Sequence, residues 1–587
     1  MALDRLLGKK IVVNEGAYNM VKDATEDLRA HLSEACGVNF TIEKQDSSIT
    51  TGIFLNLLYP RKDSAYLKRL DIDNQDVFLL EGDGKRFVKI SAFSKQGLVN
   101  GIYTYLDRLG FRWYYPGELW KYVPKLMDVG ISIDTIEKPD FVLRAFFGTF
   151  GTPRNRVIDK NAIVDREWNL WSVRNRLGGT YSLKGHAWGD FFWRNIQTFL
   201  KHPEYAALVN GKRSELNSGG IKFCTSNKGL QELFVQDRVA ELKKNMNDIP
   251  NRPVYTVSVE PSDGEGFCEC DECRKLGTIS TRVFLLANLV AKEFQKVSPK
   301  AFVNLYAYNK HAAPPDIALE PNVIVQIIPY GYQDYTSPEV MFKEWKLKCN
   351  HLFVYDYYGL PILNLDKPLQ GSLTPIEFAN RIRFWHDQGI KGITLESSYS
   401  IGATGLGLYL FSRLSWNINT NVEREVSEFY QKIYGNAAGK VRQAQSALET
   451  DTNLIDKRIS LHLASRIIDS QETATQNDTI LGARLTSYKA YLLYLNFLYD
   501  FQRNEITEDT TAIDRLMTFV YGTFFLKMVH PFPVSEWLKN YGANPEYAKR
   551  CWDTFNPTKK GMKFSSVRQW RKEEIDAAFR ESVTRTD

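Results

Sequence analysis

The sequence predicts an α/β protein built on a TIM (β/α)8 barrel, with a small N-terminal α/β domain and a C-terminal α-helical domain. Eight apolar segments, rich in β-branched and aromatic residues, alternate with amphipathic helical segments over roughly 275 residues. Each segment turns polar at its carboxyl-terminal end, as buried parallel strands do. The 587 residues are also too many for one compact core. A doubly wound open sheet is the competing architecture, but it normally has fewer strands.

Residues 1–135 are predicted to form the small α/β domain. Helical spacing of apolar residues predicts one helix from Val21 to Ala35, stopped by Gly37, and a second from Ser94 to Leu109. No glycine-rich phosphate loop follows a strand here, so we expect a scaffold. Apolar or alternating runs predict strands at 11–16, 52–58, 76–82, 86–92 and 111–117.

Residues 136–420 are predicted to form the barrel and residues 421–587 the helical domain. Helices are expected at 229–246 and 281–297, and the last barrel helix begins near Gly405. An apolar stripe in the helical domain is expected to be a packing surface, and it consists of Leu481, Leu485, Tyr488, Leu492, Leu495 and Tyr499. The eight barrel strands are expected at 141–148, 180–188, 220–227, 254–264, 301–311, 323–332, 352–359 and 392–398.

Composition excludes several classes of protein. The 75 basic and 69 acidic residues give a net charge of only +6, and the basic residues are scattered, which argues against nucleic acid as a partner. No uncharged apolar run reaches about 18 residues, so no transmembrane segment is expected. The start MALDRLLGKK lacks the apolar core of a signal peptide. We expect export to the periplasm or cell surface with the signal peptide absent; a cytoplasmic location is the alternative. Oligomeric state is not indicated.

Seven cysteines cannot all pair within one chain, but four of them could converge. They are Cys224 and the cluster Cys268, Cys270 and Cys273. A four-thiolate zinc site fits this spacing, and a disulfide or a packed loop of reduced thiols fits it too. In each case we expect the cysteines to brace the adjacent loop.

The active site is expected at the carboxyl ends of the barrel strands, where a TIM barrel carries its catalytic residues. The polar and aromatic side chains there suit glycosidic chemistry, in which one carboxyl group protonates the leaving oxygen and a second group supports an oxocarbenium-like centre. No metal-binding set, nucleophile elbow or cofactor is expected there. The candidate residues are Arg144, His186, Trp188, Glu260, Asp263, Tyr308, Asn309, Tyr330, Asp356, Tyr357 and Glu396.

Glu260 is the predicted general acid, because it directly follows a strand and Asp263 lies close enough to perturb its pKa. Such an acidic pair also commonly caps the next helix or loop. Trp188 is expected to be a sugar platform, and Asp356 either a nucleophile or a hydroxyl-binding group. His186 could bind a sugar hydroxyl or be structural. Glu396 could bind a hydroxyl or hold Arg144 in a salt bridge, and the tyrosines could instead fill the rim.

Several motifs resemble known glycosidases. The stretch 99–125 is similar to the small domain that precedes the barrel in α-glucuronidases and β-hexosaminidases. The motifs GHAW (185–188), HPEYAALVNGKR (202–213), KFCTSN (222–227), SVEPSDGEGFCECDEC (258–273) and LESSYSIGATGLGLYLFSRLSWN (395–417) resemble the family known as domain of unknown function 4838. That family includes glycoside hydrolase family 163, the endo-β-N-acetylglucosaminidases of gut Bacteroidetes that act on complex N-glycans.

The resemblance implies retaining cleavage in the chitobiose core through an oxazoline intermediate formed by the substrate's own acetamide. It implies Glu260 as acid/base and Asp263 as the group that polarises the acetamide, although the two are not adjacent as the pair is in hexosaminidases. Asp356 or Glu396 could take the second role, and Tyr330 or Tyr308 could bond the acetamide oxygen. The competing functions are an α-glucuronidase-like enzyme, which needs cations for the substrate carboxylate, and a non-catalytic carbohydrate-binding barrel.

Overall fold

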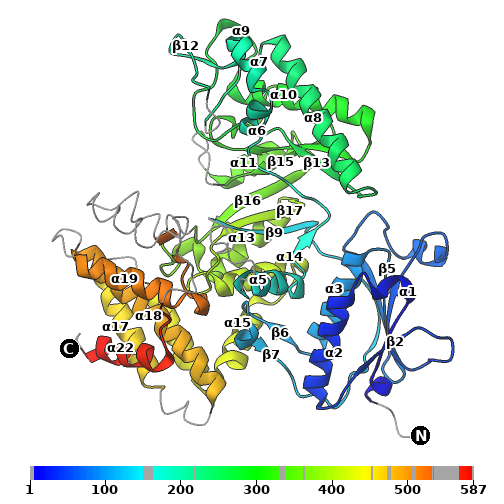
Figure 1. Cartoon of the computed structure of the whole chain (residues 1–587), viewed down its shortest axis with the longest axis vertical. Helices are drawn as coiled ribbons and strands as arrows, with labels where there is room; N and C mark the ends of the chain where they lie inside the picture. Colours follow the sequence, from blue (N-terminus) through cyan, green and yellow to red (C-terminus); the bar gives the residue numbers. More distant parts are fainter. Residues whose placement is uncertain are drawn as a thin grey trace.

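The computed structural model describes most of the chain. Figure 1 shows the N-terminal strands and the helices α17–α22 at opposite sides of the molecule, with α5 between them and α7–α10 at one end of the long axis. The described residues are 5–149, 163–216, 220–329, 337–360, 364–450, 454–471, 478–504, 510–531, 533–534 and 568–584.

The N-terminal sheet has the strand order β2-β1-β3-β5-β4-β8, with β4 antiparallel to both of its neighbours. Helices α2 (Lys22–Cys36) and α3 (Lys95–Arg108) lie on one face (Figure 1). Gly101 lets α3 approach the sheet, because a Cβ there would lie 2.3 Å from a methyl carbon of Ile90. The strands are β1 (Lys10–Val13), β2 (Thr41–Lys44), β3 (Gly52–Leu57), β4 (Phe78–Asp83), β5 (Phe87–Ala92) and β8 (Ser132–Glu137).

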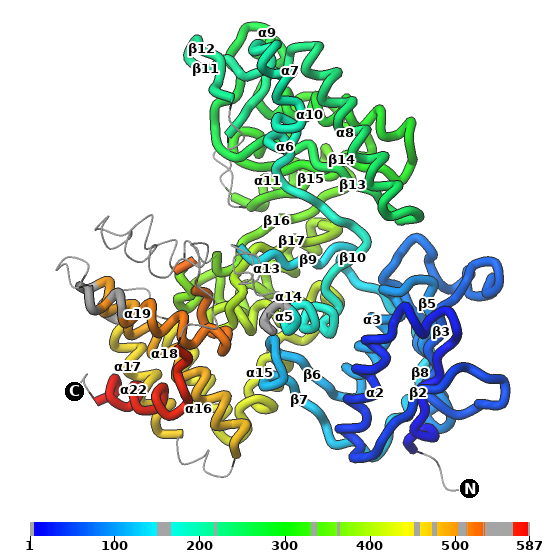
Figure 2. Tube along the Cα trace, in the orientation of Figure 1, coloured from blue at the N-terminus to red at the C-terminus, as the bar shows by residue number. Residues whose placement is uncertain are grey.

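Four of the five strands expected in this part of the chain are confirmed, as are both helices. The run 111–117 forms only the two-residue strand β6 (Arg112–Trp113), which pairs with β7 (Lys121–Tyr122). This hairpin reaches toward α15 (Val422–Tyr434), where Arg112 lies 3.8 Å from Glu428 (Figure 2). The N-terminal part of the chain also contains α1 (Glu15–Tyr18), η1 (Leu7–Lys9), η2 (Ser64–Lys68) and η3 (Glu118–Trp120).

The central sheet is a curled half-barrel and not the complete eight-stranded barrel that the sequence predicted. Its seven strands have the order β10-β9-β17-β16-β15-β14-β13, all parallel except the two-residue β10, which runs antiparallel to β9. Six of the eight predicted strands are present. The strands are β9 (Leu143–Gly148), β10 (Gly178–Gly179), β13 (Tyr255–Ser258), β14 (Ala301–Ala307), β15 (Val323–Ile327), β16 (Leu352–Tyr358) and β17 (Gly392–Ser397).

The segment 180–188 runs beside β13 without forming a strand. Its backbone bonds only near its ends, from the Thr180 N–H to the Val142 carbonyl and from the Ala187 N–H to the Glu260 carbonyl, and side chains hold the part between them. Thr256 and Ser258 donate to the carbonyls of Ser182 and Gly185, each at 2.5 Å. Asn304 on β14 donates to the carbonyl of Lys184 at 2.6 Å. This segment therefore closes the open side of the half-barrel. The other missing strand, at 220–227, makes a single bridge from Phe223 to Ala206.

Helices cover the outer face of the half-barrel. Asn227 caps α8 and Thr278 caps α10, each side chain accepting the backbone N–H of the residue three positions further along the chain. The helices around this sheet are α5 (Ile163–Arg174), α6 (Trp188–Arg194), α7 (Ile196–Lys201), α8 (Lys228–Asp248), α9 (Asp271–Lys275), α10 (Ile279–Val297), α11 (Pro338–Lys346), α13 (Pro375–Asp387) and α14 (Gly405–Trp416). Short elements complete it: η4 (Pro203–Tyr205), η5 (Asn309–His311), η6 (Gly371–Leu373), β11 (Leu208–Val209) and β12 (Lys212–Arg213).

After α14 the described chain is helical. All six residues of the predicted stripe on α18 are buried, which confirms the stripe as a packing surface. None of the described helices combines the length and the apolar character needed to cross a membrane. Besides α15, this region contains η7 (Gly435–Ala437), α16 (Ala438–Glu449), α17 (Leu454–Asp469), α18 (Thr479–Asn504), α19 (Thr510–Gly522), η9 (Phe524–Leu526) and α22 (Lys572–Thr584).

Candidate active site

A solvent-open cleft of about 1900 Å³ follows the inner face of the half-barrel. Strands β9, β10, β14, β16 and β17, the closing segment 181–186 and Ile328 directly after β15 contribute to its wall. The polar and aromatic side chains of the cleft include Thr149, His186, Asp263, Tyr306, Tyr308, Tyr355, Tyr357 and Glu396. Most of these residues lie at or just beyond the carboxyl ends of their strands, where an α/β barrel positions its catalytic groups.

Strand alternation decides which side chains reach the cleft. On β16, Tyr355 and Tyr357 line it, whereas Asp356 between them is fully buried on the helix side of the sheet. On β17, Thr394 and Glu396 line it for the same reason. Successive side chains of a strand point to opposite faces, and on β16 this turns Asp356 away from the cleft that Tyr357 lines.

Glu396 is a half-buried carboxylate held in place by two hydroxyl groups. The hydroxyl of Thr149 donates to Oε1 at 2.7 Å, and the phenol of Tyr355 donates to Oε2 at 2.6 Å. Burial and the negative charge of Glu396 raise the pKa of Tyr355, so this phenol stays a donor. Glu396 is therefore an oriented negative charge on the cleft wall.

Asp263 is an exposed carboxylate on the loop after β13. Its Oδ1 accepts the Gly264 N–H at 2.8 Å and lies 3.5 Å from the phenol of Tyr308. The ammonium of Lys222 donates to the Asp263 main-chain carbonyl at 2.9 Å and so holds the loop from behind. Burial lowers the pKa of Lys222 to about 8. Among the described residues Oδ2 of Asp263 has no partner, and it is available to a ligand.

The two carboxylates act on the same tyrosines. Burial raises the pKa of both Tyr308 and Tyr357, and the negative charges of Asp263 and Glu396 raise each of them further. A phenol that responds to two carboxylates must lie within electrostatic reach of both. Asp263 and Glu396 both line the cleft, and so do Tyr308 and Tyr357.

Glu260, the predicted acid, lies outside the cleft. Its side chain is 1% exposed. Its Oε2 accepts the Tyr306 N–H at 2.7 Å, and its Oε1 lies 3.0 Å from Nε2 of His311. With both oxygens engaged under the end of β14, Glu260 joins β13 to β14 and η5, and it has no open position for a sugar. This placement corrects the expectation drawn from its position directly after a strand.

Glu260→Gln should therefore lower stability far more than turnover. The amide places a donor where an acceptor now faces His311 or the Tyr306 N–H, at a cost of about 1–3 kcal/mol in the free energy of unfolding. Thermal denaturation and kcat per folded molecule measure the two effects. A hundredfold drop in kcat with an unchanged unfolding temperature would show that Glu260 is a catalytic residue.

His186 lines the cleft as expected, whereas Trp188 does not. Nδ1 of His186 lies 2.5 Å from the carbonyl of Pro261, which fixes the ring beside Tyr306. Trp188 is fully buried, stacks on Phe223 at 4.5 Å, and donates its indole N–H to the carbonyl of Val259. Trp188 is therefore a core residue of this part of the fold and offers no face to a sugar.

Three further candidates do not line the cleft, and a fourth cannot be placed. Arg144 pairs with Asp76 of the N-terminal sheet region, so it does not bridge to Glu396. Asp356 lies 2.9 Å from Arg381 of α13. Asn309 begins η5 with a left-handed backbone conformation (φ 50°) and is absent from the wall of the cleft. Tyr330 lies outside the described residues.

The structure adds Thr149, Tyr306 and Tyr355 to the site. Tyr306 and Tyr355 face each other with their ring centroids 5.3 Å apart and give the cleft an aromatic floor. The sequence could have predicted both, because Tyr306 lies two positions before Tyr308 and Tyr355 two positions before Tyr357, and residues two apart on a strand share a face. Thr149 has no such signal, because it lies one residue beyond its strand.

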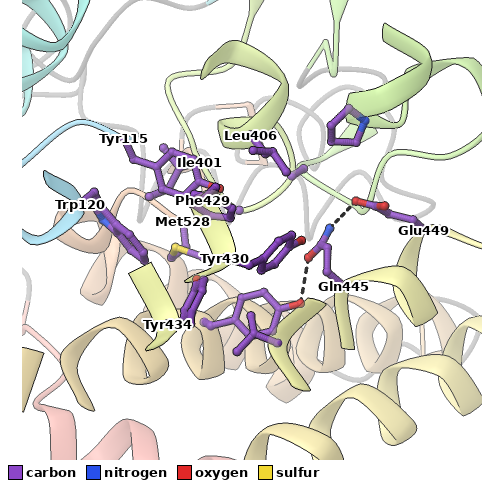
Figure 3. Close-up of a pocket in the computed structure, with 15 residues that line it drawn as sticks. Tyr115, Trp120, Ile401, Leu406, Phe429, Tyr430, Tyr434, Gln445, Glu449 and Met528 are labelled. Atoms are coloured by element: carbon purple, nitrogen blue, oxygen red, sulfur yellow. Dashed lines mark hydrogen bonds between the residues drawn. The ribbon is translucent and has the colours of Figure 1, made fainter. Parts of the chain in front are cut away.

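A second cavity, of about 460 Å³, separates the loop after β17 from the C-terminal helices. Figure 3 shows several aromatic side chains in its wall, among them Tyr115, Trp120, Tyr430 and Tyr434. Its polar groups bond to one another, since Tyr488 donates to Gln445 and Gln445 donates to Glu449, each at 2.8 Å. This cavity is a gap in packing, so we place the function in the larger cleft.

Several solved structures that are similar to this chain are glycoside hydrolases. A family 89 glycoside hydrolase from Clostridium perfringens, in complex with GlcNAc-alpha-1,4-galactose, aligns with a TM-score of 0.52 at 10% identity, covering 97% of this chain and 75% of that one. A complex of a Clostridium perfringens family 89 enzyme with 2-acetamido-1,2-dideoxynojirimycin gives 0.50, again at 10% identity and with the same coverage. A family GH115 4-O-methyl-alpha-glucuronidase gives 0.48 at 12% identity, covering 97% and 78%.

At these identities the likeness to the family 89 structures concerns the fold alone. The comparison with curated proteins found no match. The model of the family described as domain of unknown function (DUF4838) matches residues 115–445. This range covers more than half of the chain and includes the half-barrel and its cleft. The chain therefore belongs to the DUF4838 family.

Proposed function

We propose that the protein is a glycoside hydrolase whose catalytic carboxylates are Asp263 and Glu396. The observation that carries this proposal is their common position in one cleft, with Tyr306, Tyr308, Tyr355 and Tyr357, toward the carboxyl ends of a curled parallel sheet. Glycosidic cleavage needs two carboxyl groups across the scissile bond. Aromatic rings supply the flat apolar surface on which the C–H face of a sugar packs.

The surroundings of the two carboxylates suggest different roles. Glu396, with its oxygens bonded to Thr149 and Tyr355, is the fixed charge that supports the positive anomeric centre. Asp263 is the proton donor, because its exposed Oδ2 is available on a loop at the mouth of the cleft. Tyr357, which senses both carboxylates, is placed to donate to a substrate oxygen between them.

The substrate we propose is the chitobiose core of complex N-glycans, cleaved by a retaining endo-β-N-acetylglucosaminidase reaction. The acetamide oxygen of the substrate attacks the anomeric carbon while the bond to the leaving oxygen breaks and Asp263 protonates that oxygen. Water, deprotonated by Asp263, then opens the oxazoline and restores the configuration. The resemblance to glycoside hydrolase family 163 supports this substrate, as does the family 89 enzyme that binds GlcNAc compounds on the same fold.

A uronic acid substrate fits the cleft less well, since its carboxylate needs a cation near the reacting carboxylates. Among the described residues that line the cleft, the cations are Lys184 and Arg252. Lys184 lies 3.9 Å from Glu241, and its side chain is largely exposed. Arg252 precedes β13 at the amino end of the sheet. Arg144, the cation that the sequence offered for this purpose, is fully buried in its pair with Asp76.

Incubation with a complex N-glycoprotein should release free glycan, detected by mass, with the β-anomer formed first by NMR. A thiazoline analogue of the oxazoline should inhibit the reaction competitively. Glycan binding without turnover would instead support a non-catalytic carbohydrate-binding barrel. Turnover that is insensitive to the thiazoline would indicate an enzyme nucleophile.

Asp263→Asn should lower kcat/KM on the glycoprotein by about 10²–10⁴-fold, because the amide cannot donate a proton to the leaving oxygen. An aryl glycoside with an acidic leaving group should lose much less, since that group departs without a proton. Asp190→Asn, an exposed carboxylate on α6 outside the cleft, is the matched control and should retain full activity. Equal losses on both substrates would contradict the role of Asp263 as acid.

A further inference from the structure

Four cysteine side chains gather behind the loop that carries Asp263. The Sγ atoms of Cys224, Cys268, Cys270 and Cys273 all lie within 4.8 Å of one another. Cys224 belongs to the segment before α8, whereas the other three come from the loop after β13 and from the short helix α9. None of the four is part of a disulfide. The fold thus brings together thiols that lie more than forty residues apart in the chain.

The spacing of the sulfur atoms fits one small tetrahedral ion. Four thiolates bound to zinc at about 2.3 Å lie about 3.8 Å from one another. Cys224 Sγ lies 3.6 Å from Cys270 Sγ and 3.8 Å from Cys273 Sγ. An iron–sulfur cluster would hold its cysteines further apart, because its own iron and sulfide atoms lie between them. A disulfide would bring two sulfurs to about 2 Å and leave the others aside.

The surroundings of the cluster favour thiolates. The Leu208 N–H donates to Cys268 Sγ at 3.3 Å, and the Ser226 hydroxyl lies 3.2–3.7 Å from the sulfurs of Cys224, Cys270 and Cys273. The Leu208 N–H orients a thiolate and compensates its charge, and the Ser226 hydroxyl, which here accepts from the Cys273 thiol, can donate to one sulfur once the thiols are deprotonated. Apolar residues 207–209 pack around the cysteines and form a small core separate from the main one. This shell keeps Cys224, Cys268 and Cys273 buried, and Cys270 is half-buried.

The segments that carry the cysteines have little other regular structure to hold them. Next to the cluster lie the two-residue strands β11 and β12 and the five-residue helix α9, and helix α8 begins four residues after Cys224. Small folded units with so little apolar core usually depend on a metal ion or disulfides. A bound ion would join the Cys224 segment to the 263–273 loop, the two segments that Lys222 also links through the Asp263 carbonyl.

We propose that Cys224, Cys268, Cys270 and Cys273 bind one structural Zn²⁺ ion that fixes the loop bearing Asp263. With four protein ligands the ion has no open position for substrate, so its role is to hold the loop and not to take part in the reaction. The inference does not depend on the proposed glycosidase activity, because metal binding is measured without any substrate.

The test is the metal content of the full-length protein after dialysis against metal-free buffer. We expect one zinc per chain. Replacement by Co²⁺ should give the intense visible bands of tetrahedral cobalt and near-ultraviolet thiolate charge-transfer bands. An organomercurial that caps the thiols should release the zinc stoichiometrically and lower the unfolding temperature.

Variants separate the cluster from other cysteines. Cys270→Ser, at the most exposed of the four positions, and Cys273→Ser should lose most of the zinc, whereas Cys349→Ser, a buried cysteine elsewhere, should retain it. If a cluster variant does not fold, the proposal is tested on the unchanged protein, by its cobalt spectrum and by the release of zinc with the organomercurial. Zinc well below one per chain with four freely reactive thiols, stoichiometric iron instead of zinc, or disulfides among the four would each overturn the proposal.

Discussion

Glu396→Gln should lower kcat for glycoside hydrolysis by about 10³-fold while leaving the folded structure intact. The substitution removes the fixed negative charge that faces the developing positive charge of the transition state, and preorganised charges of this kind account for large rate effects. The hydroxyls of Thr149 and Tyr355 can rotate to suit an amide, so we expect a stability change below about 1 kcal/mol. Release of glycan by mass and thermal denaturation measure the two quantities.

Glu425→Gln is the matched control for this experiment. Glu425 is a buried glutamate on α15 that also accepts from a tyrosine, Tyr409, at 2.7 Å, and it pairs with Arg413 at 3.2 Å. Its replacement should lower the unfolding temperature and leave kcat per folded molecule unchanged. If Glu396→Gln retained normal turnover, Glu396 would not be one of the catalytic carboxylates, and the proposed pair would fail.

Asp76→Asn should cost about 3–5 kcal/mol of stability, because it leaves the charge of Arg144 buried without a partner. Both side chains are fully buried, and two nitrogens of Arg144 approach the carboxylate oxygens at 2.8 and 3.3 Å. Asn100 also donates to this carboxylate at 2.9 Å. The pair joins the N-terminal sheet region to β9, so we expect the unfolding temperature to fall by about 5–10 °C.

A double-mutant cycle isolates the pair. Replacing both partners, with Asp76→Leu and Arg144→Met, should recover most of the lost stability, since two apolar groups leave no charge unpaired. The control is Glu26→Gln at the exposed pair with Arg29, which should cost less than about 1 kcal/mol. An Asp76→Asn variant that melts like the unchanged protein would show that the Arg144 guanidinium finds other compensation.

The sequence was sufficient for most of the fold because apolar periodicity follows directly from burial. Six barrel strands and both N-terminal helices were predicted from that pattern. The segments 180–188 and 220–227 have the same apolar character, yet neither is a strand. For 180–188, side chains of the neighbouring strands occupy carbonyls that backbone pairing would use. Which neighbour a segment has, and what that neighbour donates, is not encoded in the segment's own pattern.

The candidate site was predicted in part. Asp263, Tyr308, Tyr357, Glu396 and His186 do line the cleft. Applying strict alternation to β16 would have excluded Asp356 once Tyr357 was accepted. The pairing of Arg144 could not be predicted from the sequence of its own strand, because its partner Asp76 lies 68 residues away in a different sheet region. The structural role of Glu260 could not be predicted either, because it depends on a contact with His311 that forms only in the folded chain.

The way the half-barrel is closed bears on how its cleft can change over evolutionary time. Along 182–185 the joint with β13 and β14 depends on three short polar side chains, those of Thr256, Ser258 and Asn304. Single substitutions there can shift this wall while every ladder of the sheet stays intact. A lineage could thus widen or narrow the groove, and admit bulkier or more branched ligands, without having to rebuild its scaffold.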